Sequence, residues 1–220
     1  VFAEDDVHVH GEFTARGGDI DGDGGFIETS GLKQLDITHV PDASAANGQR
    51  GDWLIDPNNI TIQSGADINV DLSSFGGTDD YTSNDDAAFL STETIVAALE
   101  GGTNVTITTT DSDFDNSSGG VGTELGDINL NSPLVISQSF TSADLNLNAD
   151  NDININFNIF SNNTGSYDLN LSPNVDALGG GQVNINSANI LDSFNLNING
   201  NSVVSGVVNI LSSGVNLGAG

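Results

Sequence analysis

The sequence predicts an all-β fold, a right-handed parallel β-helix in which short strands stack as successive coils of a solenoid. A motif recurs between Gly126 and Leu211 and alternates a branched apolar residue with Asn, as in Ile153-Asn154-Ile155-Asn156. This period of two is typical of a strand with one buried face. The segments between copies are short and rich in Gly, Ser, Asn and Asp, which favours turns over crossover helices. One such strand cannot bury its apolar face alone, so the copies predict coils that share a core.

A β-sandwich of hairpins is the alternative architecture for these strands. Hairpins favour two-residue Asn-Gly or Asp-Gly loops, and such pairs occur only within residues 21–24, 47–48 and 199–200. The copies also repeat with nearly the same residues, as the stacking of like on like requires. We therefore predict the β-helix, with coils of roughly twenty residues.

The period-two pattern assigns each residue of the repeated motif to the core or to the outer surface. Outward Asn side chains at equivalent positions of successive coils can stack into hydrogen-bonded ladders along the axis. The predicted inward residues are Ile128, Leu130, Leu145, Leu147, Ile153, Ile155, Leu169, Leu171, Val183, Ile185, Leu196 and Ile198. The predicted ladder residues are Asn129, Asn146, Asn154, Asn170, Asn184, Asn197 and Asn209.

Charge is strongly negative and unevenly distributed. The chain of 220 residues has a formal net charge of −28, and its only basic side chains are Arg16, Lys33 and Arg50. Of the 31 acidic residues, 10 precede Gly51 and 21 follow it. Such self-repulsion destabilises a compact state unless salt or divalent cations screen it. We therefore expect saline or calcium-containing surroundings, with neither nucleic acid nor anionic membranes as partners.

The chain is expected to form a single β-helix unit, residues 1–220, with three segments. Residues 1–75 and 126–220 are predicted to be coils, and residues 76–125 a loop-rich segment. Within that segment a helix is expected over Thr92–Leu99, with Thr92 as its N-cap and Gly101-Gly102 at its end. Acidic stretches at residues 76–86 and 111–120 are predicted to be loops that leave the stack. No apolar run is long enough to span a membrane.

Two groups of alternating acidic side chains are candidate calcium ligands. Asp19, Asp21 and Asp23 imitate the first half of an EF-hand loop, in which carboxylates at alternate positions bind the ion. Ser30 occupies the position of the bidentate Glu in that loop, and Glu28 lies two residues early. An acidic turn exposed to solvent is the alternative interpretation. The second candidate group consists of Asp111, Asp113 and Asp115.

Two histidines alternate with valines near the start of the chain, in Val7-His8-Val9-His10. Alternation places His8 and His10 on the same face of a strand, which is one way for two imidazoles to hold a metal ion. The sequence offers no evident third ligand. The favoured interpretation is therefore two exposed polar positions on an edge strand.

Several short sequence segments in the first half of the chain resemble those of a known family. Residues 24–31 read Gly-Gly-Phe-Ile-Glu-Thr-Ser-Gly, residues 53–62 read Trp-Leu-Ile-Asp-Pro-Asn-Asn-Ile-Thr-Ile, and a further match covers residues 94–107. In this order they resemble the filamentous-haemagglutinin-like large exoproteins, the adhesin passengers of two-partner secretion systems. The resemblance implies a secreted, cell-surface β-helix, in which residues 1–75 form haemagglutinin-like coils. The Asn-Pro-Asn motifs of that family's secretion domain are absent from this sequence.

The residues show no catalytic pattern, so we expect no enzymatic activity. Pectin-cleaving β-helices need a basic side chain, and no Lys or Arg follows Arg50. The predicted function is a secreted structural or adhesive β-helix, either a fibre segment or a cell-surface stalk. The alternative is a calcium-dependent module that binds ice or carbohydrate, with surface glycans as partners.

Both ends of the chain have the pattern of strands, at residues 7–10 and again at residues 207–211 and 215–217. The end strands of a solenoid offer unpaired edges. We therefore expect the coils either to continue into further protein or to stack head to tail on another copy. Cations would offset the negative charge that opposes such stacking.

Overall fold

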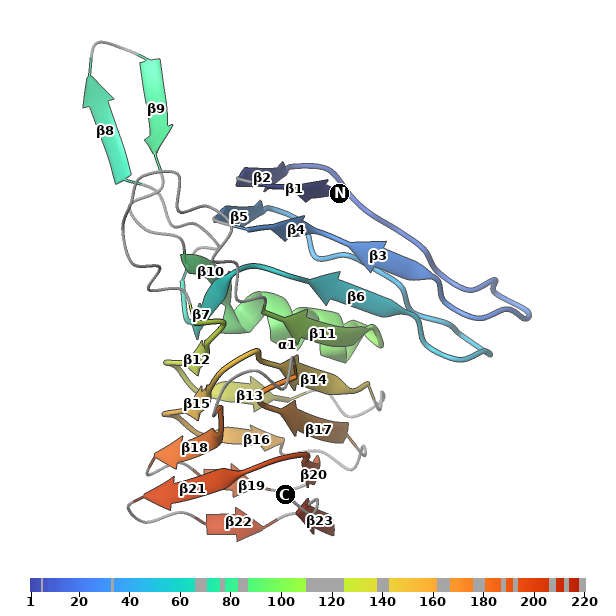
Figure 1. The fold of residues 1–220 in the computed structure, drawn as a ribbon. Coiled ribbons are helices and arrows are strands. Elements are labelled where there is room, and N and C mark those ends of the chain that lie inside the picture. The colour runs from blue at the N-terminus through green and yellow to red at the C-terminus, as the bar shows by residue number, and fades with distance from the viewer. Residues whose placement is uncertain are drawn as a thin grey trace.

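The computed structural model is a parallel β-solenoid of about five turns, whose regular structure is mostly strands with one short helix (Figure 1). The predicted fold class is therefore confirmed. The residues that the structure describes are 1–4, 6–32, 34–65, 71–75, 78–82, 87–109, 125–137, 143–161, 167–175, 181–186, 189–191, 194–205, 209–211 and 214–217.

Three parallel sheets run along the stack, because each coil of the C-terminal half contributes one strand to each sheet. The six-stranded sheet has the order β10 (Ala87–Ser91), β7 (Asn59–Gln63), β12 (Ile128–Leu130), β15 (Ile153–Ile155), β18 (Val183–Asn186) and β21 (Ser202–Ser205). The seven-stranded sheet has the order β23 (Gly214–Leu217), β20 (Phe194–Ile198), β17 (Tyr167–Ser172), β14 (Leu145–Asn148), β11 (Asn104–Thr108), β6 (Asp52–Ile55) and β3 (Phe26–Glu28). The four-stranded sheet has the order β13 (Leu134–Ile136), β16 (Ile159–Ser161), β19 (Asn189–Leu191) and β22 (Asn209–Leu211).

Two short parallel pairs form the N-terminal end of the solenoid. Strand β1 (Phe2–Ala3) pairs with β4 (Ser30–Gly31), and strand β2 (Asp6–Val9) pairs with β5 (Gln34–Ile37). Val7 and Val9 of β2 and Leu35 of β5 are buried, so the alternate residues of these strands face outward.

The core consists of the apolar residues that the alternation assigns to the inside. All of the predicted inward residues are buried, with exposed fractions of 2% or less, which confirms the assignment. Larger side chains fill the interior beside them. Trp53 is fully buried, and its indole N–H donates a hydrogen bond to Thr29 Oγ1 at 2.8 Å. The polar end of this large side chain is thus satisfied inside the stack.

Successive coils place like residues on like. Ile128 pairs with Ile153 and Ile153 with Val183 in the six-stranded sheet, whereas Leu145 pairs with Leu169 in the seven-stranded sheet. Equivalent Asn side chains of these coils are 24 to 30 residues apart. These coils are therefore longer than the expected roughly twenty residues, because each coil holds a strand of all three sheets and the turns between them. The last coil matches the expectation, because Val183 pairs with Ser202 and Ile190 with Ile210, 19 and 20 residues apart.

One helix, α1 (Thr92–Gly101), interrupts the succession of strands and packs against β13. Its N-cap is Ser91, whose hydroxyl accepts from the Thr94 backbone N–H, so the expected cap at Thr92 is one residue late. Gly102 ends the helix in the left-handed region, at φ 87°, as expected for a glycine C-cap. Glu93 accepts hydrogen bonds from a backbone N–H and two hydroxyls, and these lower its pKa, although partial desolvation acts in the opposite direction.

The acidic stretch 76–86, expected to be a loop, lies partly in a hairpin. Strand β8 (Asp71–Phe75) pairs antiparallel with β9 (Thr78–Thr82), and the pair projects from the stack (Figure 1). The sequence between the two strands is Gly76-Gly77. Gly-Gly is a favoured two-residue hairpin connection, as Asn-Gly is, and it predicts this hairpin. The other expected acidic loop, residues 111–120, lies outside the described residues.

Replacing Ile155 with Asp tests the inward assignment. Ile155 is fully buried and lies between Leu130 and Ile185 of the adjacent coils. An unpaired carboxylate there should lower the free energy of unfolding by about 4 kcal/mol or more. The control is Phe157→Asp, because this side chain is 45% exposed. Thermal unfolding followed by circular dichroism should show a large loss for Ile155→Asp alone, and equal losses would contradict the assignment.

Candidate functional site

Asn side chains on the six-stranded sheet bind one another along the axis. Asn154 Nδ2 donates to Asn129 Oδ1 at 2.9 Å, and Asn184 Nδ2 donates to Asn154 Oδ1 at 2.8 Å. Asn154 thus uses its donor toward one coil and its acceptor toward the other. A second row beside it has the same arrangement, in Asn131, Asn156 and Asn186.

A separate ladder lies on the seven-stranded sheet. Asn170 Nδ2 donates to Asn146 Oδ1 at 2.7 Å, and Asn197 Nδ2 donates to Asn170 Oδ1 at 2.8 Å. Thr106 continues this row, because its Oγ1 accepts from Asn146 Nδ2 at 3.1 Å. The Asn residues expected in ladders therefore divide between two faces. Asn209 lies in β22 of the third sheet, and its side chain is outside the described part of the chain.

Acidic and amide side chains at strand entrances form a third kind of link, which the sequence interpretation missed. Asp127 Oδ1 accepts from the backbone N–H of Asp152 at 3.1 Å, and Asp152 Oδ1 accepts from that of Gln182 at 2.8 Å. The same link joins Asn104 Oδ1 to the Asp144 backbone N–H at 3.1 Å on the seven-stranded sheet. The sequence signal is an Asp or Asn immediately before the apolar alternation, as in Asp127-Ile128 and Asp152-Ile153.

Asp144 is the residue of these links at which a negative charge is disfavoured. Burial raises the pKa of the Asp144 carboxyl, and the neighbouring carboxylates of Asp168 and Asp52 raise it further. The Asp168 backbone N–H and the Arg50 guanidinium oppose this shift by lowering the pKa. Asp144 Oδ1 also accepts from the Asp168 backbone N–H at 3.4 Å. The site therefore needs an acceptor oxygen but is poorly suited to a negative charge.

Two of the predicted calcium ligands of the first group accept hydrogen bonds from backbone N–H groups. Asp21 Oδ1 accepts from the Gly22 backbone N–H and Asp23 Oδ1 from that of Gln49, both at 2.8 Å. Asp19 is exposed, and Glu28 lies in β3. Together these four side chains do not form a set whose oxygens all lie within 4.8 Å of one another. Calcium binding here stays a prediction. The second group lies outside the described residues: Asp111, Asp113 and Asp115.

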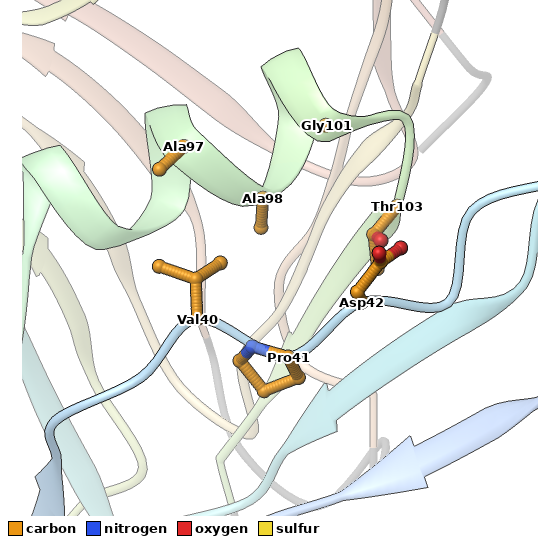
Figure 2. Close-up of a pocket in the computed structure, with 7 residues that line it drawn as sticks. All are labelled: Val40, Pro41, Asp42, Ala97, Ala98, Gly101 and Thr103. Atoms are coloured by element: carbon orange, nitrogen blue, oxygen red, sulfur yellow. The ribbon is translucent and has the colours of Figure 1, made fainter. Parts of the chain in front are cut away.

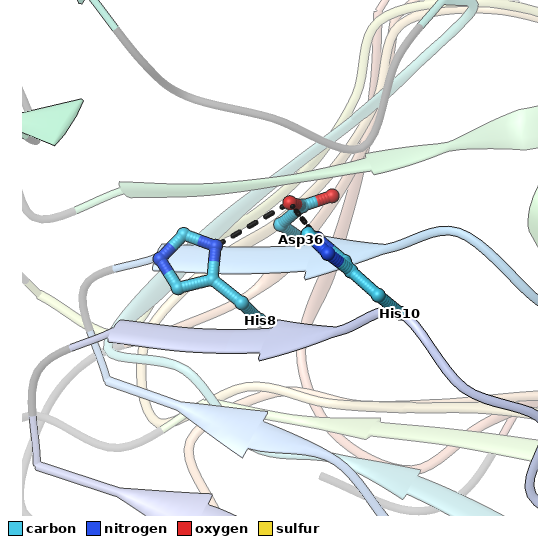
Figure 3. A group of neighbouring side chains, drawn as sticks. All are labelled: His8, His10 and Asp36. Atoms are coloured by element: carbon cyan, nitrogen blue, oxygen red, sulfur yellow. Dashed lines mark hydrogen bonds and ion pairs between the residues drawn. The ribbon is translucent and has the colours of Figure 1, made fainter. Parts of the chain in front are cut away.

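The structure places a third potential metal ligand, Asp36, beside His8 and His10. Asp36 of β5 lies in register with His8 of β2 (Figure 3). Its Oδ2 atom is 3.3 Å from His8 Nδ1 and 2.7 Å from His10 Nε2. Their ligand atoms all lie within 4.8 Å of one another. Among the residues that the structure describes, three or more metal-ligating side chains come this close together only here. No sequence signal pairs Asp36 with the histidines, because the pairing depends on the register of strands 28 residues apart.

A shallow hollow of about 210 Å³ lies between helix α1 and the segment Val40–Asp42 (Figure 2). Ala97 and Ala98 face Val40 and Pro41 across it. Its polar atoms already have partners, since Thr103 Oγ1 accepts from the Ala43 backbone N–H and Asp42 binds Ser44. A small-molecule site usually has a larger volume and several convergent polar groups. The hollow is therefore a packing gap between helix α1 and the coil rather than a small-molecule site.

Comparison with protein-family models finds no match, and a search of curated proteins finds no significant match. The resemblance to the filamentous-haemagglutinin-like exoproteins therefore stays a prediction. Within the described residues, no helix combines the length and the apolar character needed to cross a bilayer.

Replacing Asp144 with Asn should stabilise the protein at neutral pH. The amide keeps an acceptor oxygen for the Asp168 N–H but removes the poorly accommodated charge. Because the folded-state pKa is raised, the folded state binds the proton more tightly. The stability of the parent therefore falls as the pH rises from about 3.8 through the raised pKa. Melting temperatures between about pH 4 and pH 8 should show that the advantage of Asp144→Asn grows with pH.

The matched variant is Asp144→Ala, which removes both the charge and the acceptor. It should melt below Asp144→Asn at neutral pH, because the Asp168 N–H loses a partner. An Asp144→Asn protein that is less stable than the parent at every pH would show that the Asp144 charge does not destabilise the folded state.

Removing a middle ladder residue should cost more stability than removing a terminal one. Asn154→Ala loses hydrogen bonds to both Asn129 and Asn184, and we expect a loss of about 1–2 kcal/mol. Asn129→Ala loses the single bond to Asn154 and should cost roughly half as much. Chemical denaturation of the three proteins measures the difference. Equal losses would show that the number of ladder hydrogen bonds does not determine the loss of stability.

Proposed function

We propose that the protein is a non-enzymatic structural or adhesive β-solenoid, a segment of an extracellular fibre or cell-surface stalk. The observation that carries the proposal is the pair of Asn ladders on two faces of the stack. Their amides bind the amides of adjacent coils, so these faces reinforce the axis of the solenoid. Such repetition suits a rod whose role depends on length and stiffness.

The third face differs from the two ladder faces and supports the adhesive part of the proposal. Val135 of β13 and Phe160 of β16 lie in register and are half-buried, where the other sheets carry Asn. Beside them, a hollow of about 190 Å³ is lined by Thr92, Glu93, Val96, Pro133 and Val135. Apolar outward positions in a row are typical of a contact surface.

The charge supports an extracellular setting. A net charge of −28 with three basic side chains is compatible with a compact solenoid where salt or calcium screens it. Secretion and the cell-surface location rest on the family resemblance in residues 24–62 and 94–107.

The C-terminal end offers a surface for continuation of the rod. Strands β21, β22 and β23 each form the last described strand of their sheet, so one edge of each lacks a strand partner in the described part of the chain. The partner with matching geometry is another coil of the same kind. We propose that it comes from a second copy or from neighbouring segments of a longer chain.

Sedimentation velocity and negative-stain electron microscopy test this assembly. The chain should sediment as a monomer in chelator and low salt, because its charge opposes contact. In millimolar calcium it should form head-to-tail rods with the width of one solenoid. A monomer at high concentration in calcium would contradict self-stacking. Binding to a glycan surface without assembly would favour the calcium-dependent carbohydrate-binding function instead.

Two neighbouring proline variants test whether the outer edge of β23 is the contact between copies. Successive N–H groups of a strand point to opposite sides, so one of Val215→Pro and Asn216→Pro removes a bond to β20. The other leaves the bonds to β20 in place and removes an outward donor. The variant that keeps the parent melting temperature should assemble poorly, and its normal assembly would show that this edge is not the contact.

A further inference from the structure

We infer that His8, His10 and Asp36 form a binding site for a divalent first-row transition metal, such as zinc. The site lies on the outer face of the β2–β5 pair, at the N-terminal end of the solenoid (Figure 3). It is separate from the acidic groups considered for calcium, and it does not depend on the proposed fibre function.

The strands themselves place the three ligands. The buried residues Val7, Val9 and Leu35 anchor β2 and β5 to the core, so His8 and Asp36 point outward from paired positions. His10 follows β2 with the same parity as His8, and the two imidazole rings lie 6.1 Å apart. The ligands therefore come from a packed region with defined register, which is a precondition for a site formed before the metal binds.

The distances suit a small ion. Ligand atoms bound to zinc at roughly 2.0–2.2 Å in a tetrahedral arrangement lie about 3.3 Å apart. Asp36 Oδ2 is 3.3 Å from His8 Nδ1 and 2.7 Å from His10 Nε2, and all ligand atoms lie within 4.8 Å. Small rotations of the imidazoles would therefore bring the three atoms around one centre.

The ligand types select the class of metal. Two imidazoles and one carboxylate suit zinc and its first-row neighbours, whereas calcium and magnesium prefer sets made entirely of oxygen. The Asp36 side chain is 12% exposed, whereas those of His8 and His10 are 38% and 63% exposed. The carboxylate thus forms the inner wall of the site and the imidazoles its open rim. Three protein ligands leave at least one coordination position for water.

Metal binding would fasten the first coil to the second. Within the described residues, β5 is the strand that pairs with β2 in its two-stranded sheet. A metal ion would join His8 and His10 to Asp36, which is 28 and 26 residues away. Because such a site is absent from the unfolded chain, binding adds to the stability of the fold.

Zinc titration by calorimetry tests the site, with the full chain free of any affinity tag and first stripped by chelator. The parent should bind one zinc ion per chain at micromolar concentration and melt at a higher temperature when loaded. His8→Ala, His10→Ala and Asp36→Asn should each weaken binding by at least about tenfold. The matched control is His39→Ala, which removes the remaining histidine of the chain and should leave binding unchanged.

Two further measurements guard against loss of fold and against binding by acidic residues in general. Nitrogen-15 spectra of the parent should show zinc shifting the ring signals of His8 and His10 but not those of His39. Millimolar calcium should leave the zinc isotherm unchanged. Absence of zinc binding in the parent, equal loss in His39→Ala, or displacement of zinc by calcium would each overturn the assignment.

Discussion

The structure depends on the parallel register of one coil on the next. Backbone hydrogen bonds run along the axis, so a side chain of a paired strand lies directly above or below its equivalent in the adjacent coil. Ile153 lies between Ile128 and Val183 for this reason, and Asn154 between Asn129 and Asn184. The same constraint creates a dry core and a polar ladder, because both follow from repeating one short motif in register.

The register also explains why Asn, rather than Asp, dominates the ladders. An Asn amide has both a donor and an acceptor, so a row of identical residues satisfies itself. Ionised Asp only accepts, and two stacked carboxylates repel each other. Asp168 is accommodated because Asn195 Nδ2 donates a hydrogen bond to its Oδ1 atom at 2.7 Å. Asp144 lies next to the Asp168 carboxylate, which contributes to its raised pKa. The Asp residues at strand entrances are tolerated because a backbone N–H of the next coil supplies the donor.

How much of this could be predicted depends on whether a feature is local. The alternation predicted the core residues and the fold class. The cap signals predicted the N-cap of helix α1 to within one residue, whereas the helix ends at Gly101, two residues beyond the expected Leu99. The hairpin of β8 and β9 also has a local signal, because Gly76-Gly77 separates its two strands in the sequence. The grouping of Asp36 with His8 and His10 has no local signal, because it depends on the lengths of the turns between β2 and β5. The Asn residues divide between two sheets because each of the coils from β12 to β20 contributes an Asn-bearing strand to both the six-stranded and the seven-stranded sheet.

The lack of basic side chains gives these hydrogen bonds a particular importance. From Gly51 onward the sequence contains no Lys or Arg, so internal donors for carboxylates are backbone N–H groups, hydroxyls and Asn or Gln amides. These donors satisfy the geometry of a carboxylate but do not cancel its charge. Carboxylates of the solenoid can therefore be hydrogen-bonded while most of its charge stays unneutralised. Neutralisation must come from ions in the solvent, which makes the ionic surroundings part of what determines the stability of this fold.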